Sequence, residues 1–207
     1  ASLAGKRIAI TGSTGFVGTA LVERLLRCVP DCDLVLLVRD GRRTPATRRT
    51  QREILKNDAF DRLRATHGDN FDRAVASRIQ TVAGDVTRDG LGLNEADRAL
   101  WGTADTIIHS AAAVSFDSPM DSAVEINLLG PTRLADLANE IRVTPHLVAV
   151  STCYVAGNRR GSAPEILVSA GPFDVGIDWR SEVTATRRLR SDTDALSRTP
   201  DQLKIFR

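Results

Sequence analysis

The stretch TGSTGFVG, residues 11–18, constrains this chain of 207 residues more than any other segment. It follows the short apolar run KRIAIT (Lys6–Thr11) and opens a segment, Gly15–Arg27, whose apolar residues recur at helical spacing. A glycine-rich turn between a strand and a helix lets a phosphate approach the helix N-terminus, where free N–H groups favour negative charge. The stretch therefore predicts a dinucleotide site, with a glycine-rich turn that holds no ligand as the alternative.

The three glycines of this motif have separate expected roles. Gly12 permits the tight turn, Gly15 lets the backbone approach a pyrophosphate, and Gly18 allows the helix to pack closely on the sheet. The remaining residues expected to bind the cofactor here are Thr11, Ser13, Thr14, Phe16 and Val17.

Strand-like apolar runs alternate with helical patterns along the rest of the chain. The expected strands are Asp33–Arg39, Arg78–Ala83, Asp105–His109 and His146–Ser151. Helices are expected from about Pro45 to Ser77, over Asn94–Leu100 with Asn94 as N-cap, over Met120–Arg142 and over about Ser181–Leu196. This order predicts an α/β fold with a doubly wound, Rossmann-like parallel sheet.

The end of the second expected strand bears on cofactor choice. NAD sites usually carry an acid there that binds the ribose 2′-hydroxyl. This chain has Arg39, whose guanidinium can hold a 2′-phosphate through two hydrogen bonds, with Arg42 and Arg43 nearby. The sequence thus favours NADP(H), and the alternative is that Asp40 binds the ribose while Arg39 is solvated. A solvated helix face is expected for Arg48, Arg49 and Arg52.

The overall composition excludes several classes of function. A net charge of +2 gives no argument for nucleic acid as a partner. No apolar run approaches the roughly 20 residues of a membrane span, so no transmembrane segment is expected. Cys28, Cys32 and Cys153 lack the partners of a zinc set, so free thiols in the cytoplasm and no metal are expected. We expect His109, at the end of an apolar strand, to be buried and hydrogen-bonded.

The loop resembles the TGxxGxxG motif of the extended short-chain dehydrogenase/reductase family, and further matches follow in order. Gly84-Asp85-Val86 looks like the acid that accepts from the adenine amino group, which implies adenine contacts for Asp85 and Val86. His109–Ala113 resembles the stretch that passes under the cofactor, and Asn127–Gly130 resembles the NxxG motif. The resemblance thereby implies cofactor roles for Ser110, Ala111, Ala112, Ala113 and Asn127.

Ser151-Thr152-Cys153-Tyr154 ends the fifth expected strand, where this family keeps its catalytic hydroxyl. Thr152 is the better match to that hydroxyl, which binds the substrate carbonyl, and Ser151 is the alternative. Capping of the strand end is the non-catalytic interpretation of both.

Within this family the chain is most similar to the NADP-binding domain of fatty acyl-CoA reductases. The likeness extends over nearly all of residues 6–157 and no single motif carries it; it includes REILKNDAFDRLR (52–64) and AAVSFD (112–117). Reductase domains of carboxylic acid reductases are a close second. The resemblance implies NADPH-dependent reduction of long-chain acyl-CoA to an aldehyde, with further reduction to the alcohol left open. A cytoplasmic location is expected, and peripheral contact with a membrane is compatible with it. Alternatives are an acyl thioester on a carrier protein, a nucleotide-sugar epimerase or dehydratase, and a non-catalytic NADP-binding regulatory module.

The match stops at the family's catalytic YxxxK pair. The chain has one tyrosine, Tyr154, whose i+4 residue is Asn158, and its lysines are Lys6, Lys56 and Lys204. We interpret the chain as a truncated reductase, inactive by itself, with a dinucleotide-binding domain over 1–157. Residues 158–207 would then begin a substrate-side region, with the sheet incomplete at its C-terminal side. A binding-only protein is the alternative, and Tyr154 is expected to be a packed aromatic residue.

Overall fold

The computed structural model describes residues 3–115, 117–141, 144–157, 160–167, 174 and 176–197. The chain divides into two compact units, of which the first comprises residues 1–115 and 125–150. The second comprises residues 116–124 and 151–207. Arg142, Asn158 and Lys204, which the sequence analysis names, lie outside the described residues.

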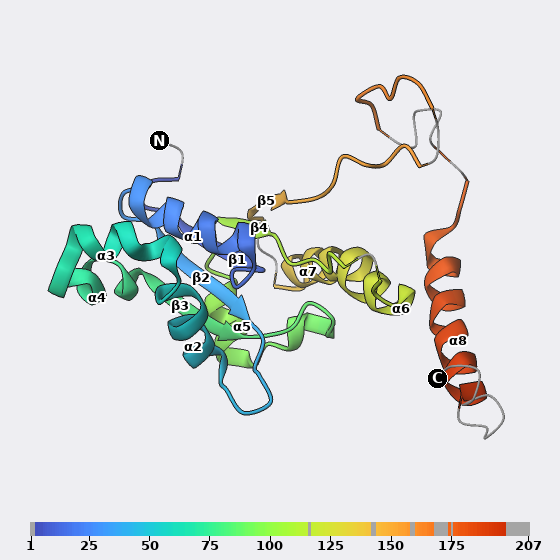
Figure 1. The fold of residues 1–207 in the computed structure, drawn as a ribbon, viewed down its shortest axis with the longest axis horizontal. Coiled ribbons are helices and arrows are strands. Elements are labelled where there is room, and N and C mark those ends of the chain that lie inside the picture. The colour runs from blue at the N-terminus through green and yellow to red at the C-terminus, as the bar shows by residue number, and fades with distance from the viewer. Residues whose placement is uncertain are drawn as a thin grey trace. The chain divides into compact units, whose positions relative to one another are not determined.

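The first unit is built on a parallel sheet of five strands in the order β3-β2-β1-β4-β5 (Figure 1). The strands are β1 Arg7–Thr11, β2 Asp33–Val38, β3 Ile79–Ala83, β4 Thr106–His109 and β5 His146–Ala149. Each forms where the sequence predicts it, and the bounds differ by one or two residues. The chain runs outward from β1 in one direction to β3 and then returns to add β4 on the other side, so the strand order reverses beside β1.

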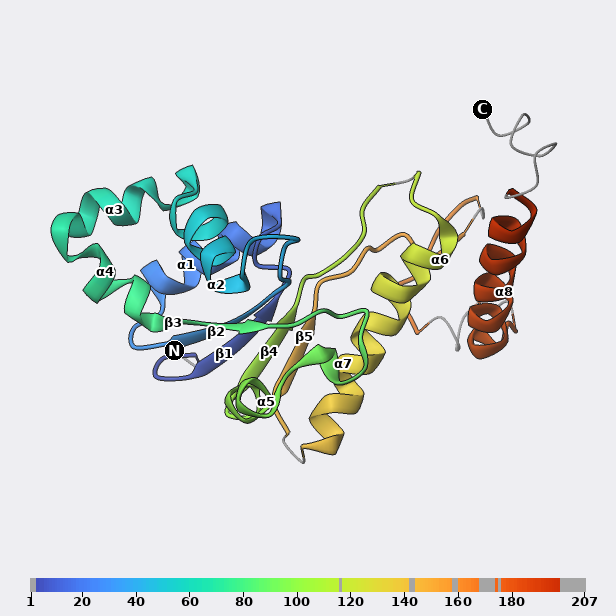
Figure 2. The same cartoon turned by 90° about the horizontal axis from the view of Figure 1, so that it is seen from below.

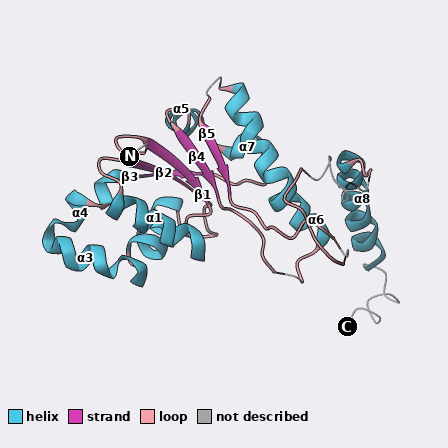
Figure 3. Ribbon diagram, turned by 90° about the horizontal axis from the view of Figure 1, so that it is seen from above, coloured by secondary structure: helices cyan, strands magenta, loops and turns pink. Residues whose placement is uncertain are grey.

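Helices cover both faces of this sheet (Figures 2 and 3). On one face, α1 Phe16–Cys28, α2 Ala46–Arg49 and α3 Asp61–His67 pack on Ile8 and Ile10 of β1. On the other face, α5 Glu95–Trp101 and α7 Leu129–Glu140 share a core with Ala9. Successive side chains of a strand point to opposite faces, and this is why β1 feeds both cores. The predicted doubly wound α/β fold is confirmed.

The region between β2 and β3 is a series of short helices instead of one continuous helix. Four apolar side chains, Ile54, Leu55, Phe60 and Leu63, anchor it in the core of the α1 face. Its elements after α2 are a π-helix Thr50–Leu55, a 3-10 helix Asp58–Phe60, α3, a 3-10 helix Gly68–Asn70, α4 Phe71–Ala74 and a 3-10 helix Ala76–Arg78.

Arg78, the last residue of this region, donates hydrogen bonds to carbonyls at and just after the C-terminal end of α1. Its guanidinium donates to the carbonyls of Leu26, Val29 and Cys32, each at 2.9 Å, and its Nη2 lies 3.0 Å from the Cys32 Sγ. The last carbonyls of a helix have no partner within the helix, so a cation there stabilises them. Burial raises the pKa of the Cys32 thiol, with Arg78 opposing that shift.

The helix after β3 begins as predicted. The Asn94 side chain accepts from the Asp97 backbone N–H at 2.8 Å, so Asn94 is the N-cap of α5. A 3-10 helix, Asp89–Gly92, precedes it.

The predicted helix over Met120–Arg142 is divided into three parts. α6 Met120–Ala123 is followed by a π-helix, Val124–Leu128, and then by α7. Pro131 lies in the first turn of α7 and has no N–H to donate toward Asn127, four residues before it. The wider π-turn accommodates this break, and π-turns of this kind are frequent at functional sites.

The second unit contains α6 and α8 Trp179–Ser197, and this α8 range contains the predicted helix Ser181–Leu196. Arg190 of α8 forms an ion pair with Asp121 of α6 at 3.6 Å. Tyr154 is 91% exposed, so the expectation of a packed aromatic residue is wrong. No helix in the described part of the chain is long and apolar enough to cross a membrane.

Candidate functional site

A pocket lies in the first unit at the carboxyl ends of β1, β2, β3 and β4. Open parallel sheets bind ligands at this edge, beside the point where the strand order reverses. Residues that line it are Gly12, Thr14, Gly15, Leu37, Val38, Arg39, Arg49, Asp85, Val86, Thr87, Ser110, Ala111, Ala112 and Ile126. The topology thus brings together segments that are up to about a hundred residues apart in the sequence.

The three glycines of the loop differ in the space that surrounds them. Gly12 has φ +74°, and a Cβ there would lie 2.5 Å from the Ser110 carbonyl carbon. A Cβ on Gly18 would lie 2.1 Å from the Gly12 oxygen, so the close packing at Gly18 is against the turn that follows β1. Gly15, the N-cap of α1, is different because a Cβ there would meet only the Gly12 oxygen, at 3.3 Å. The protein needs Gly12 and Gly18 for its own turn, whereas the space above Gly15 opens to the pocket.

Thr11 joins the ends of β1 and β4 beneath this turn. Its Oγ1 accepts from the N–H groups of Ser110 and Ala111, both at 3.2 Å, and lies 2.8 Å from His109 Nδ1. With its oxygen accepting twice, the hydroxyl has its own proton to donate, so we assign His109 as the acceptor. Burial lowers the pKa of His109, in keeping with a neutral ring. His109 is therefore buried and hydrogen-bonded, as expected.

The other predicted loop residues divide between the interior and the surface. Ser13 is 1% exposed and its carbonyl accepts from the Thr19 hydroxyl at 3.0 Å. Thr14 lines the pocket, while Phe16 and Val17 are exposed at the start of α1. Thr11, Ser13, Phe16, Val17 and Gly18 are not among the lining residues.

The loop after β3 presents one carboxylate oxygen to the pocket side. Asp85 Oδ1 accepts from the backbone N–H and the hydroxyl of Thr87, at 2.9 and 2.8 Å. Its Oδ2 lies 4.0 Å from Arg39 Nη1. The Thr87 bonds fix the direction of the carboxylate and leave Oδ2 on the side of the Arg39 guanidinium.

Two arginines meet at the end of β2. Arg49 Nη1 donates to the Arg39 carbonyl at 2.7 Å, and the rest of its guanidinium grips Glu53 at 2.8 and 2.9 Å. The Arg49 hydrogen bond is the main cause that lowers the pKa of Glu53. Arg49 lines the pocket, so its interpretation as part of a solvated face is wrong. Asp40 instead accepts from the Ala46 N–H at 2.8 Å, which braces the start of α2.

The stretch after β4 is held by a side chain from the π-helix. Asn127 Oδ1 accepts from the Ala113 N–H at 2.8 Å, and its Nδ2 donates to the Ala113 carbonyl at 2.9 Å. Neither residue lines the pocket, whereas Ser110, Ala111 and Ala112 do. Asn127 therefore affects the pocket indirectly, by holding the backbone of Ala113 next to the lining residue Ala112.

The two candidate catalytic hydroxyls belong to the second unit. Ser151 and Thr152 are both exposed there, and Thr152 Oγ1 accepts from the Tyr154 backbone N–H at 3.1 Å. Among the described residues there is no group of three or more His, Cys, Asp or Glu side chains that could hold a metal ion.

Five lining residues were not predicted from the sequence, namely Leu37, Val38, Arg49, Thr87 and Ile126. Val38, Thr87 and Ile126 each adjoin a predicted site residue, and Leu37 lies two residues before Arg39, so position along the chain could have indicated these four. Arg49 carried no comparable signal, because it lies ten residues after Arg39 and the sequence does not distinguish it from its neighbours Arg48 and Arg52.

Comparison with known proteins agrees with this geometry. The chain is 34% identical over 177 residues to "Fatty acyl-CoA reductase 2, chloroplastic" of Arabidopsis thaliana, covering 84% of this chain and 28% of that protein. It is 32% identical to "Alcohol-forming fatty acyl-CoA reductase" of Simmondsia chinensis, covering 84% and 35%. The chain thus spans about a third of the length of these curated relatives.

Solved structures that resemble this chain are also those of reductase domains. The terminal R domain of the myxalamid PKS-NRPS pathway superposes with a TM-score of 0.59 at 31% identity, over 77% of this chain and 38% of that one. The reductase domain of a nonribosomal peptide synthetase from Mycobacterium tuberculosis gives 0.53 at 30%, over 74% and 34%. The predicted resemblance to fatty acyl-CoA reductases and to reductase domains within the extended short-chain dehydrogenase/reductases is confirmed.

The model of one family, described as Male sterility protein, matches residues 10–203, which is nearly the whole chain. This match, the parallel sheet and the glycine loop at the end of β1 all agree. The chain belongs to the Male sterility protein family.

Proposed function

We propose that this chain is the NADP(H)-binding part of an enzyme that reduces long-chain fatty acyl thioesters, with acyl-CoA as substrate. Hydride adds to the thioester carbonyl, the C–S bond breaks, and the thiol leaves with a proton from water while the aldehyde forms. A second hydride and a second proton take the aldehyde to the alcohol. Relatives named as fatty acyl-CoA reductases, one of them alcohol-forming, support this proposal. Residues 1–157 form the cofactor domain in this proposal, and 158–207 begin the substrate side.

The observation that carries the cofactor assignment is the meeting of Arg39 and Arg49 in the same pocket as Gly12 and Gly15. The Arg39 guanidinium suits a 2′-phosphate, since arginine binds phosphate through paired N–H donors. Arg49 donates to Glu53 and to the Arg39 carbonyl, so it supports the site by holding the Arg39 backbone in place. The acid that would serve NAD, Asp40, already accepts a hydrogen bond from a backbone N–H. These residues fit NADP(H) better than NAD(H).

The remaining pocket residues suit the other parts of the dinucleotide. The open space above Gly15 at the α1 N-terminus suits the pyrophosphate. Asp85 Oδ2 suits the adenine amino group, beside Val86, and the Ser110–Ala113 backbone held by Asn127 lies along the cofactor. When bound, the reduced cofactor supplies the hydride that reaches the acyl carbonyl.

Thr152, with Ser151 as the alternative, is proposed to bind the substrate carbonyl through its hydroxyl. Cytoplasmic location with peripheral membrane contact is part of the same proposal, because the acyl chain is apolar. The likeness to R domains of peptide synthetases supports a second candidate substrate, an acyl thioester on a carrier protein.

Calorimetric titration of the chain with NADPH and NADH tests the cofactor assignment. A charged, bidentate contact contributes about 1.5–3 kcal/mol, so NADPH should bind at least about tenfold more tightly. Arg39→Ala should remove most of that preference and Arg49→Met a large part of it. Arg52→Ala is the matched control, because Arg52 is exposed on the same helical segment and does not line the pocket. Equal affinity of the parent chain for the two cofactors contradicts the assignment.

A further inference from the structure

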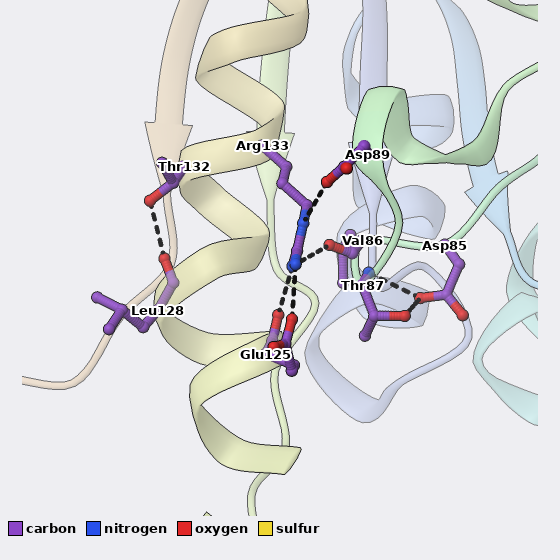
Figure 4. A network of polar contacts seen from close by, with 8 residues as sticks. All are labelled: Asp85, Val86, Thr87, Asp89, Glu125, Leu128, Thr132 and Arg133. Atoms are coloured by element: carbon purple, nitrogen blue, oxygen red, sulfur yellow. Dashed lines mark hydrogen bonds and ion pairs between the residues drawn. The ribbon is translucent and has the colours of Figure 1, made fainter. Parts of the chain in front are cut away.

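Arg133 of α7 is a charged residue that the proposed function leaves without a role. Its side chain is only 12% exposed, and Figure 4 shows it pointing from the helix toward the loop after β3. Its guanidinium donates to Glu125 Oε2 at 2.6 Å, to the Glu125 carbonyl at 3.1 Å, to Asp89 Oδ1 at 3.2 Å and to the Val86 carbonyl at 3.4 Å. A single side chain therefore contacts two separate backbone segments, the loop after β3 and the π-helix Val124–Leu128.

Both segments contribute residues to the wall of the pocket. Val86 lines the pocket next to Asp85, and Asp89 begins the 3-10 helix that ends the same loop. Glu125 lies in the π-helix directly before the lining residue Ile126. Arg133 thus connects the adenine-side loop to the π-helix, which in turn holds the stretch after β4 through its asparagine.

A second observation places Val86 under close constraint from α7. A Cβ on Gly130 would lie 3.4 Å from the Val86 Cβ, so the helix backbone packs directly on this residue. Val86 is 6% exposed, and it is held on one side by α7 and through its carbonyl by Arg133.

The charge on Arg133 is retained despite its burial. Burial by itself lowers the pKa of the guanidinium, but the bonds to Glu125 and Asp89 outweigh it and raise the pKa above its ordinary value. A neutral side chain at this position would leave the loop carbonyl and the two carboxylates without their shared donor. Hydrogen bonds to charged groups are stronger than those between neutral groups. Losing the bonds of Arg133 should therefore change the conformation of the Asp85–Asp89 loop.

We infer that Arg133 is a positioning residue for the adenine end of the cofactor site, which it shapes by clamping the Asp85–Asp89 loop to the π-helix Val124–Leu128. This inference rests on the proposed function, because it presupposes that the pocket binds a dinucleotide. Arg133 does not line the pocket itself and acts through Val86, Asp89 and Glu125.

The test compares two probes, NADPH and adenosine 2′,5′-bisphosphate, on the parent chain and on variants, by calorimetric titration well below the unfolding temperature. The bisphosphate carries the adenine and the 2′-phosphate but no nicotinamide. Arg133→Met should weaken both probes by the same factor, roughly tenfold. Arg133→Lys should lose less, because an ammonium group keeps the charge but cannot reach all the partners in one plane.

Arg98→Met is the matched control. Arg98 pairs with Glu140 of the same helix α7 at 2.6 Å, so this variant also removes a cross-element Arg–Glu pair. Both probes should bind it with the affinity of the parent chain. If Arg133→Met does not fold, Asp89→Asn decides, because the Asp89 side chain is fully exposed and can be changed without loss of core. We expect a reproducible loss of about twofold for both probes in that variant.

Several results would overturn the inference. One is a folded Arg133→Met chain that binds both probes as tightly as the parent, and another is an Asp89→Asn chain with parental affinity where Arg133→Met does not fold. A third is weaker NADPH binding with unchanged bisphosphate binding, since Arg133 would then act at a different part of the site. A parent chain that binds neither probe is a separate outcome, because it removes the proposed function itself and the inference with it.

Discussion

Replacing Gly15 by valine should abolish dinucleotide binding while the chain stays folded. Gly15 has φ −84° and ψ 169°, an extended conformation that a β-branched residue adopts readily. The nearest atom to an added Cβ is the Gly12 oxygen at 3.3 Å, which needs to move by only a few tenths of an ångström. The loss of unfolded-state entropy on replacing glycine offsets that strain by about 0.4–1 kcal/mol. The free energy of unfolding should therefore stay within about 1 kcal/mol of the parent.

Binding responds differently because the valine methyl groups occupy the space through which the pyrophosphate reaches the α1 N-terminus. Charge-assisted hydrogen bonds contribute about 1.5–3 kcal/mol each, so two lost phosphate contacts weaken binding by about a hundredfold or more. The assay pairs calorimetric titration with NADPH with urea unfolding of the same preparation. A Gly15→Val chain that binds NADPH within threefold of the parent would refute the role of this loop as the phosphate site.

Two further glycine variants separate binding from stability. Gly102→Val is the matched control, since a Cβ on Gly102 would also have its closest contact at 3.3 Å, to Ile141 Cδ1, and Gly102 lies outside the pocket. It should bind NADPH normally. Gly18→Ala should instead lower the free energy of unfolding, by about 3 kcal/mol. The reason is that a Cβ only 2.1 Å from the Gly12 oxygen forces the turn to shift.

Two other predictions concern stability. Arg78→Met removes a guanidinium that holds two carbonyls at the end of α1 and that of Cys32 before β2, and urea unfolding should show a loss of about 2–4 kcal/mol. Arg73→Met, at an exposed position, should change little. For His109, burial lowers the pKa in the folded state, so the unfolded chain takes up the proton more readily and stability falls as the pH drops below about 6.5. His109→Gln should make the free energy of unfolding less dependent on pH between about pH 7 and pH 5, and an unchanged slope would contradict the assignment.

Much of the fold could be predicted because its signals are local. A buried parallel strand appears in the sequence as a continuous apolar run, and a helix packed on one side appears as apolar residues at helical spacing. The N-cap at Asn94 was visible for the same reason, since the cap and the N–H it accepts are three residues apart. The glycine loop was recognisable because strand, turn and helix follow each other directly, and the order of these elements indicates the end of the sheet where a ligand binds.

The bounds of long helices were predicted less well. The π-turn before α7 depends on how Pro131 is accommodated and on the contact between Asn127 and Ala113, fourteen residues earlier. Helical periodicity continues through such a break, so the sequence pattern alone indicates one continuous helix.

The sequence by itself determined the order of strands and helices, the glycine turn and the presence of an arginine at the end of β2. Only the tertiary structure decided which similar segments are buried and which distant charges meet. DLVLLV and HLVA are both apolar runs, yet β2 lies inside the sheet with five of six residues buried while all four residues of the edge strand β5 are exposed. Arg49 and Arg133 likewise look like surface charges in sequence, and each is held by partners from other elements. Burial and ion pairing depend on neighbours that folding brings from elsewhere in the chain, and the local sequence does not indicate which residues those neighbours are.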